Sequence, residues 1–205
     1  MALGSDIIRY SSAWAYAVEL WSAAKDGRPE LRDQALAEFA RLAEDGDPHA
    51  QDTLADMYFN GDGVPKDLEL SRYWRDRLAA LGERGNVAAQ MLLHWNYLMG
   101  PIVRDWDIAA YWLLKAAEAG DPEAQYEIWC NAEIVFPGDA GEAKRKAAPW
   151  LEKAAAQEYA EAMFVLSRRF GSPDNPTPKW RELITKAADQ GLPAAIGMLR
   201  KAKPR

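Results

Sequence analysis

Few side chains in this sequence are of the types that perform chemistry, and their spacing matches no catalytic or metal-binding pattern. The 205 residues include two histidines, His49 and His94, and a single cysteine, Cys130. A zinc site or a thiol nucleophile needs such residues at a defined spacing or beside a base, and these three have neither. The segment from Asn60 to Gly63 faintly resembles a calcium-binding loop but lacks its alternating acids and final glutamate. We therefore expect no catalytic residue, no metal and no cofactor, with an enzyme as the remote alternative.

A short sequence phrase recurs along the chain. It is best preserved at residues 44–51, 83–90 and 118–125, and weaker copies occupy 157–163 and 190–196. Its third position repeats every 33–39 residues, a period typical of stacked helical hairpins. A glycine after an amphipathic run indicates a helix end, and the Asp-Pro pair that follows it in two copies indicates the N-cap and first residue of the next helix. These repeat marks are Gly46, Gly85, Gly120, Glu158 and Gly191.

Between two such turns the sequence predicts a looser connection that leads into a second helix. Its glycines permit a tight loop, its valine is expected to be buried beneath the loop, and its aspartate is placed to cap the helix that follows. A tryptophan lies seven residues after that aspartate in both good copies. The positions that define the pattern are Tyr58, Gly61, Gly63, Val64, Asp67 and Trp74 in the first copy, Tyr97, Val103, Asp105 and Trp112 in the second, and Trp150 in the third.

The order of these residues resembles the Sel-one-like repeat, a relative of the tetratricopeptide repeat. The match is good over residues 43–125, whereas the third and fourth copies have degenerate loops. The resemblance implies an all-α fold, a right-handed α/α solenoid of helical hairpins, with protein binding as its function. We expect one solenoid domain over 1–205. It comprises a divergent helix pair at 11–45, repeats at 47–85, 86–120, 121–158 and 159–191, and a capping helix and tail at 192–205.

Composition narrows the range of partners. The chain is 49% hydrophobic with a net charge of −6, and the acidic excess lies in its first hundred residues. An acidic chain is repelled by phosphates, so nucleic acid is not expected as a partner. The charge favours a protein partner with a basic surface, and the alternative is a solvated helix surface tuned for solubility. No apolar run of eighteen residues predicts membrane insertion, and the single cysteine excludes an internal disulfide framework.

The location of the protein is unknown from sequence, and two alternatives stay open. Residues 1–10 lack the basic start and apolar segment of a secretion signal, so the chain as it stands is expected in the cytoplasm. A periplasmic location applies if a leader has been removed and replaced by Met1.

Nine tryptophans are an unusual number, and five lie outside the repeat position. Trp95 and Trp129 fall in the first helix of their repeats, which in solenoids of this type lines the concave surface. His94 and Trp129 stand where other copies have a small residue, so they are either aromatic anchors for a partner or fillers between imperfect repeats. The predicted partner-binding set is His94, Trp95, Trp106 and Trp129, with Asp52 and Asp56 at the acidic rim.

The resemblance suggests several roles for a bacterial protein of this kind. The favoured one is an immunity protein, monomeric when free, that binds and neutralises a cognate secreted toxin. The alternatives are a signalling or secretion adaptor that binds a peptide or regulatory protein, and a host-interaction factor.

Overall fold

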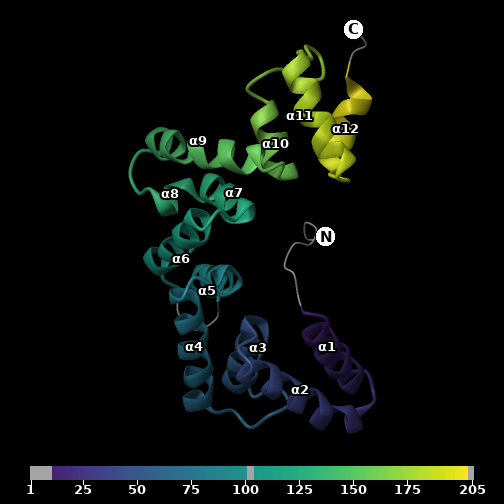
Figure 1. Cartoon of the computed structure of the whole chain (residues 1–205), viewed down its shortest axis with the longest axis vertical. Coiled ribbons are helices and arrows are strands. Elements are labelled where there is room, and N and C mark those ends of the chain that lie inside the picture. Colours follow the sequence, from purple (N-terminus) through teal and green to yellow (C-terminus); the bar gives the residue numbers. More distant parts are fainter. Residues whose placement is uncertain (1–10, 101–103, 203–205) are drawn as a thin grey trace. The chain divides into compact units, whose positions relative to one another are not determined.

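The structure is a computed structural model that describes residues 11–100 and 104–202. Within these ranges the chain forms α-helices joined by short turns and contains no β-strand (Figure 1). The predicted fold class, an all-α solenoid of helical-hairpin repeats, is confirmed. Residues 1–10, 101–103 and 203–205 lie outside the described residues. The predictions for Val103, the valine expected beneath the second loop, and for the end of the tail fall in these segments.

The chain separates into two compact units, Met1–Pro101 and Ile102–Arg205. A single solenoid domain over the whole chain therefore stays a prediction, and each unit is described by itself.

Unit 1 is built from helices that pack on their neighbours in sequence. Contacts join α1 to α2, α2 to α3, α3 to α4 and α4 to α5, and α3 also contacts α5. Successive first helices of the repeats therefore lie beside one another. The elements are α1 (Ser12–Lys25), a 3-10 turn (Pro29–Leu31), α2 (Arg32–Glu44), α3 (Pro48–Asn60), α4 (Leu68–Glu83) and α5 (Val87–Met99). The predicted helix pair at 11–45 corresponds to α1 and α2.

Unit 2 follows the same scheme with one irregular connection. The helix α7 packs between α6 and α9, α10 packs between α9 and α11, and α12 closes the series on α11. The short α8 replaces the glycine loop of the better repeats. The elements are α6 (Trp106–Glu118), α7 (Pro122–Cys130), α8 (Ala132–Val135), α9 (Ala140–Ala156), α10 (Ala160–Ser167), α11 (Pro178–Asp189) and α12 (Pro193–Lys201).

The recurring turn has the hydrogen-bond pattern that ends a helix with a left-handed residue. At the first copy the Gly46 amide donates to the Ala43 carbonyl at 3.2 Å, and the Asp47 amide donates to the Leu42 carbonyl at 2.9 Å. The Asp47 carboxylate then accepts from the Ala50 amide at 2.9 Å and caps α3. The same backbone pattern recurs at the other four repeat marks, so the predicted helix boundaries are confirmed. Glu158 adopts the left-handed conformation with φ of 61° in place of glycine.

A buried glutamine ties each of the three best-preserved turns to the preceding helix. The side-chain amide of Gln51 donates to the Ala43 carbonyl at 2.9 Å, and Gln90 donates to the Gly82 carbonyl at 2.8 Å. Gln125 makes the equivalent bond to Ala117 at 3.2 Å. This bond explains why glutamine ends the recurring phrase, because a buried helix-end carbonyl needs a donor.

The tryptophans at the repeat position are unequally buried. Trp74 and Trp112 are 6% and 5% exposed, and Trp180, three residues before the equivalent position, is fully buried. Trp150 is only partly buried, and Lys153 lies over its ring at 4.1 Å. The large side chains of the repeat therefore fill the interior of each unit, where their burial is the main stabilising term.

Two tryptophans outside the repeat position serve to dock α1. The indole ring of Trp21 lies against Gly63, where any side chain would overlap it. Lys25 of the same helix pairs with Asp62 at 2.6 Å. Trp14 donates from its indole nitrogen to the Thr53 hydroxyl at 3.3 Å. For Trp14 and Trp21 the gap-filling alternative therefore fits the structure.

Candidate protein-binding faces

A cluster of polar side chains lies where α3, α4 and α5 meet in unit 1. Asp52 and Asp56 are one helical turn apart on α3, so both face the same neighbours. Asn96 of α5 donates to Asp52 at 2.6 Å, and Arg75 of α4 donates to Asp56 at 3.2 Å. We call these four residues the aspartate cluster. Both predicted rim acids are half-buried and already engaged by a side chain of this unit.

Burial shifts the titration of both aspartates. It raises the pKa of Asp52 to about 6, an effect that the hydrogen bond from Asn96 opposes and the nearby charge of Asp56 reinforces. Burial also raises the pKa of Asp56, and Arg75 opposes that shift through its charge and its hydrogen bond. In this cluster Asp56 is therefore paired with a cation, Arg75, whereas burial makes Asp52 resist ionisation.

A second face in unit 2 combines glutamates with tyrosines. It is formed by α7 together with the start of α10, and the rings of Tyr126 and Tyr159 lie 5.5 Å apart. All of its members are half-buried, which leaves part of each side chain accessible. We call it the acidic–aromatic face, and its members are Glu123, Tyr126, Glu127, Tyr159 and Glu161.

Burial and neighbouring acids raise the pKa of two glutamates of this face, Glu123 and Glu127. Burial raises the pKa of Glu123 most, followed by the charges of Asp121 and Glu161. Burial and then Glu123 raise the pKa of Glu127, against a hydrogen bond from Asn131 at 2.9 Å. The pKa of Tyr159 is likewise raised, first by burial and then by the surrounding glutamates.

The aspartate cluster and the acidic–aromatic face differ in whether a cation pairs with their carboxylates. In the aspartate cluster Arg75 supplies a cation, but within 11–100 and 104–202 no lysine or arginine forms an ion pair with Glu123, Glu127 or Glu161. Negative charge therefore accumulates on a half-buried surface beside two aromatic rings. Such a surface attracts a positively charged group through both the carboxylates and the ring faces.

The predicted partner-binding residues divide between the two units, with Asp52, Asp56, His94 and Trp95 in unit 1 and Trp106 and Trp129 in unit 2, and one of them is corrected. His94 is 1% exposed, so it lies in the interior and the expectation that it contacts a partner is wrong. His94 occupies the repeat position at which other copies have a small residue, but the extra volume of its ring is accommodated in the interior and not on the surface. Trp95 is half-buried beside His94, with ring centroids 4.9 Å apart.

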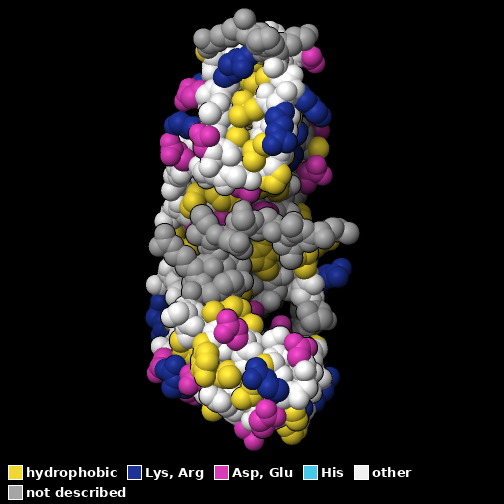
Figure 2. Space-filling view, turned by 90° about the vertical axis from the view of Figure 1, so that its right-hand side faces the viewer, with side chains coloured by type: hydrophobic (Ala, Val, Ile, Leu, Met, Phe, Trp, Pro, Cys, Tyr) yellow, Lys and Arg dark blue, Asp and Glu magenta, His cyan; other side chains and the backbone are white. Residues whose placement is uncertain are grey.

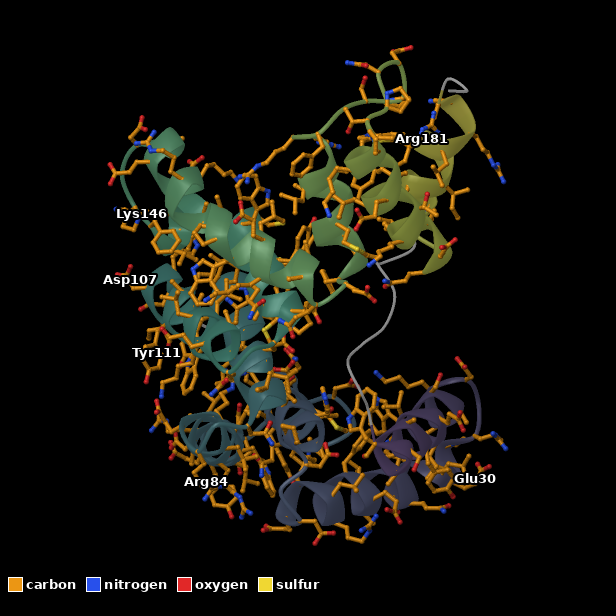
Figure 3. The ribbon with its side chains drawn as sticks, turned by 45° about the horizontal axis from the view of Figure 1, so that its top comes forward. Glu30, Arg84, Asp107, Tyr111, Lys146 and Arg181 are labelled. Carbon is orange, nitrogen blue, oxygen red and sulfur yellow. The ribbon has the colours of Figure 1, made fainter. Side chains whose placement is uncertain are left out.

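Trp129 and Trp106 have different environments. The Trp129 ring is half-buried, with Lys144 over it at 4.7 Å and Arg169 at 5.8 Å, and Lys144 also donates to the Trp129 carbonyl at 2.6 Å. It therefore already has cationic partners within unit 2. Trp106, the first residue of α6, is 62% exposed. On the same helix Asp107 and Tyr111 point outward (Figure 3).

The remaining predicted repeat residues form the first loop and the first-helix interface. Gly61 and Gly63 both adopt positive φ of 74°, and Tyr58 and Val64 pack against the core of unit 1. Tyr97 is half-buried on α5.

The sequence prediction missed the acidic–aromatic face, although one signal was present. Tyr159 stands at the position where three other copies have the N-cap residue Asp47, Asn86 or Asp121. No side chain caps α10, so a useful cap has been replaced by an aromatic ring. A departure of this kind from a repeat pattern points to a role outside the turn itself.

The described residues give no indication of a metal centre or a spanning helix. Within 11–100 and 104–202, no three histidine, cysteine or acidic side chains converge as metal ligands would. No helix in those ranges combines the length and the apolar character required to cross a bilayer.

Fold and faces together define a helical-hairpin repeat protein whose surfaces suit contact with other proteins. The Sel1 repeat is matched at residues 48–83, 87–121 and 136–159. The chain belongs to the Sel1 repeat family, as the resemblance of its motifs predicted, and is a protein–protein interaction module. The third match omits the irregular α7–α8 connection, and helical hairpins continue beyond it in α10 and α11.

Three known proteins illustrate the relationship. The exopolysaccharide production negative regulator of Rhizobium meliloti (strain 1021) is 29% identical over 175 residues, which cover 79% of this chain and 63% of that protein. A Sel1 repeat protein from Oxalobacter formigenes is 35% identical over 62% of this chain and 92% of its own, with a TM-score of 0.44. A protective antigen of uropathogenic Escherichia coli with an SLR fold is 30% identical, with a TM-score of 0.54, and covers 90% of this chain and 40% of its own. The chain thus spans less than two thirds of the length of the Rhizobium relative.

Proposed function

We propose that this chain is a non-enzymatic binding module and that its acidic–aromatic face binds a basic segment of a partner protein. The observation that carries the proposal is the group of three half-buried glutamates without a compensating cation in the described residues. Lysine or arginine side chains of a partner would neutralise these carboxylates and pack on Tyr126 and Tyr159. The raised pKa values of Glu123 and Glu127 reflect a free-energy cost of ionisation that such a cation lowers.

The biological role that we propose first is neutralisation of a cognate toxin. An immunity protein of this kind needs only to cover its target, and it needs no catalytic group. A basic surface on the toxin would be steered to the acidic–aromatic face and held there by glutamates and tyrosines.

A regulatory adaptor is the second candidate. It is favoured by the 29% identity to a negative regulator of exopolysaccharide production, which extends over 79% of this chain. In this role the same face would hold a basic segment of a signalling protein.

The binding proposal is tested with a photo-crosslinking amino acid placed at position 126 on the acidic–aromatic face or at position 111 on the outward side of α6. The full chain is expressed in its native host, and the captured protein is identified and purified. We expect capture from position 126 and none of the same protein from position 111. Capture of the same protein from both positions would contradict the assignment of this face.

The captured protein is then used to test the glutamates. The double variant Glu123→Gln, Glu127→Gln should weaken its binding by at least tenfold at low salt. The control Glu133→Gln removes an exposed glutamate of α8 and should change the dissociation constant by less than twofold. Equal weakening per removed charge in the two variants would show that only total charge matters.

Growth of cells that express the captured partner distinguishes the toxin-neutralising role from the regulatory role. If the partner is a toxin, its expression should stop growth and this chain should restore it, whereas the double variant should not. If the partner is a regulator, its expression should not be toxic, and deletion of this chain should change the transcription that the regulator controls.

A further inference from the structure

A notch opens beside the first repeat turn in unit 1. Its volume is about 340 Å³, and it is lined by Gly46 and Gln51 on one side and by Tyr73, Arg77 and Arg84 of α4 and its end on the other. The notch is distinct from the acidic–aromatic face, which belongs to unit 2.

Gln51, one of the residues that line this notch, has an unsatisfied side-chain acceptor. The side chain is 1% exposed and donates through its amide nitrogen to the Ala43 carbonyl at 2.9 Å, which fixes the direction of the amide. Its oxygen Oε1 is buried and has no hydrogen-bond partner among the described residues. A buried carbonyl oxygen without a donor costs free energy, so a group that donates to it would bind favourably.

The equivalent place in unit 2 shows which group satisfies this oxygen. Gln125 occupies the repeat position of Gln51, and its Oε1 accepts from the side-chain amide of Gln157 at 2.9 Å. The same amide of Gln157 donates to the carbonyl of Gly120 at 2.9 Å. A carboxamide from the following turn therefore bridges the glutamine oxygen and the carbonyl of the turn glycine. The following turn of unit 1 has Arg84 at the position of Gln157, and no hydrogen bond links it to Gln51 or Gly46.

The cations at the rim restrict the chemistry of an occupant. Arg77 is fixed by Glu44 at 2.7 Å and by the Tyr73 hydroxyl at 2.8 Å, and Arg84 lies exposed at the end of α4 (Figure 3). An ammonium or guanidinium group would donate to Gln51 but would be repelled by both arginines. A carboxylate would attract the arginines but could not donate to Gln51. A neutral carboxamide donates through nitrogen and accepts through oxygen, so it fits both sides.

We propose that this notch binds a side-chain carboxamide, from an asparagine or glutamine of a partner protein. The amide nitrogen bridges Gln51 Oε1 and the Gly46 carbonyl, as Gln157 does in unit 2, and the amide oxygen accepts from Arg84. The proposal rests on the proposed protein-binding function only for the source of the carboxamide, since the notch itself is a property of unit 1.

The test uses a small probe and the full chain. N-acetylglutamine methylamide is titrated to 100 mM, and the backbone amide signals of Gly46 and Arg84 and the side-chain amide of Gln51 are followed by NMR. We expect saturable shifts confined to these signals, with a dissociation constant in the millimolar range. N-acetylglutamate methylamide has the same shape and the same two backbone amides, but its side-chain carboxylate cannot donate, and it should bind at least tenfold more weakly at pH 7. Absence of saturation, or equal binding of both probes, would overturn the proposal.

Variants of the exposed Arg84 test the carboxamide proposal independently. Arg84→Gln supplies the carboxamide from within the chain, at the position of Gln157, and should weaken probe binding at least tenfold. Arg84→Met removes the same charge and the donor to the amide oxygen but supplies no amide to Gln51, so it should weaken probe binding less than Arg84→Gln does. Unchanged probe affinity in Arg84→Gln would overturn the assignment of the notch. Because the probe is measured without any partner, failure of the acidic–aromatic face would not affect this result.

Discussion

Burial separates tryptophans that look alike in the sequence. Trp112 and Trp106 lie on the same helix, yet Trp112 is 5% exposed and Trp106 is 62% exposed. The repeat position identifies Trp112 as interior because the second helix of each hairpin packs one face on its neighbours. Position on a helix, and not residue type, thus decides which tryptophan stabilises the fold and which can contact a partner.

We expect Trp112→Ala to lower the free energy of unfolding by about 3–5 kcal/mol, because it leaves a cavity among buried side chains. Trp106→Ala removes an exposed ring from the same helix and should change it by less than about 0.5 kcal/mol. Urea unfolding followed by circular dichroism measures both. A loss below about 1 kcal/mol for Trp112→Ala would mean that the repeat register is wrong.

Because the pKa of Asp52 is raised, we expect the free energy of unfolding to depend on pH. Its pKa is about 6 in the folded protein, against an ordinary value of 3.8, so between these values the folded state holds a proton that the unfolded chain has released. Stability should therefore fall as pH rises from about 4 to 6 and level off above that range. Asp52→Asn carries no charge and still offers Asn96 an oxygen acceptor.

The variant Asp52→Asn should equal the parent protein at pH 4 and exceed its free energy of unfolding by roughly 1–3 kcal/mol at pH 7. Urea midpoints between pH 4 and pH 8 give the difference, in which other titrating groups cancel. Asp33→Asn, an exposed change on α2, serves as the control. If the difference in free energy of unfolding between Asp52→Asn and the parent protein were the same at every pH, the pKa of Asp52 would not be raised.

At the level of elements, the sequence predicts what is local. The helix ends at Gly46 and Gly120 and the caps at Asp47, Asp67 and Asp105 depend on a few consecutive residues, and the structure confirms them. The acidic–aromatic face depends on side chains from two repeats, some 35 residues apart, and no local pattern places Tyr126 beside Tyr159. The prediction that His94 contacts a partner is wrong for the same reason, because the space that holds this side chain is formed by neighbouring helices.

The glutamine bridges between turns are a second feature that depends on neighbouring repeats. Gln157→Ala removes the bonds to Gly120 and to Gln125 and takes from Gln125 Oε1 the donor that satisfies it. We expect a loss of about 1–3 kcal/mol in the free energy of unfolding.

Gln190→Ala is the matched control for this change, because it removes a single bond, to the Glu158 carbonyl at 2.8 Å, and leaves no buried orphan. It should cost about 1 kcal/mol or less. Chemical denaturation of both variants gives the comparison. Equal losses would show that the bond to Gln125 contributes nothing.

At the scale of the whole molecule, charge is mixed and contacts are between neighbours. On the face shown in Figure 2, acidic and basic side chains are interspersed rather than gathered by sign. Within each unit most helices pack chiefly on the elements next to them in sequence, and α7 packs most on α9, across the short α8. The stability of such a protein is a sum of repeat and nearest-neighbour terms, so a local defect need not unfold the entire chain.

This organisation predicts how a defect spreads. Trp74→Ala creates a cavity between α3 and α4 and should reduce the hydrogen-exchange protection of amides in α3, α4 and α5 by at least a hundredfold, since about 3 kcal/mol is lost there. Amides in α10, α11 and α12 belong to the other unit and should keep their protection within about threefold. Exchange followed by mass spectrometry under native conditions measures both groups in one sample. Leu183→Ala, in α11, is the reciprocal control and should reverse the pattern. An equal loss of protection in both units after either change would show that the chain unfolds as one cooperative block, with coupling that extends well beyond adjacent repeats.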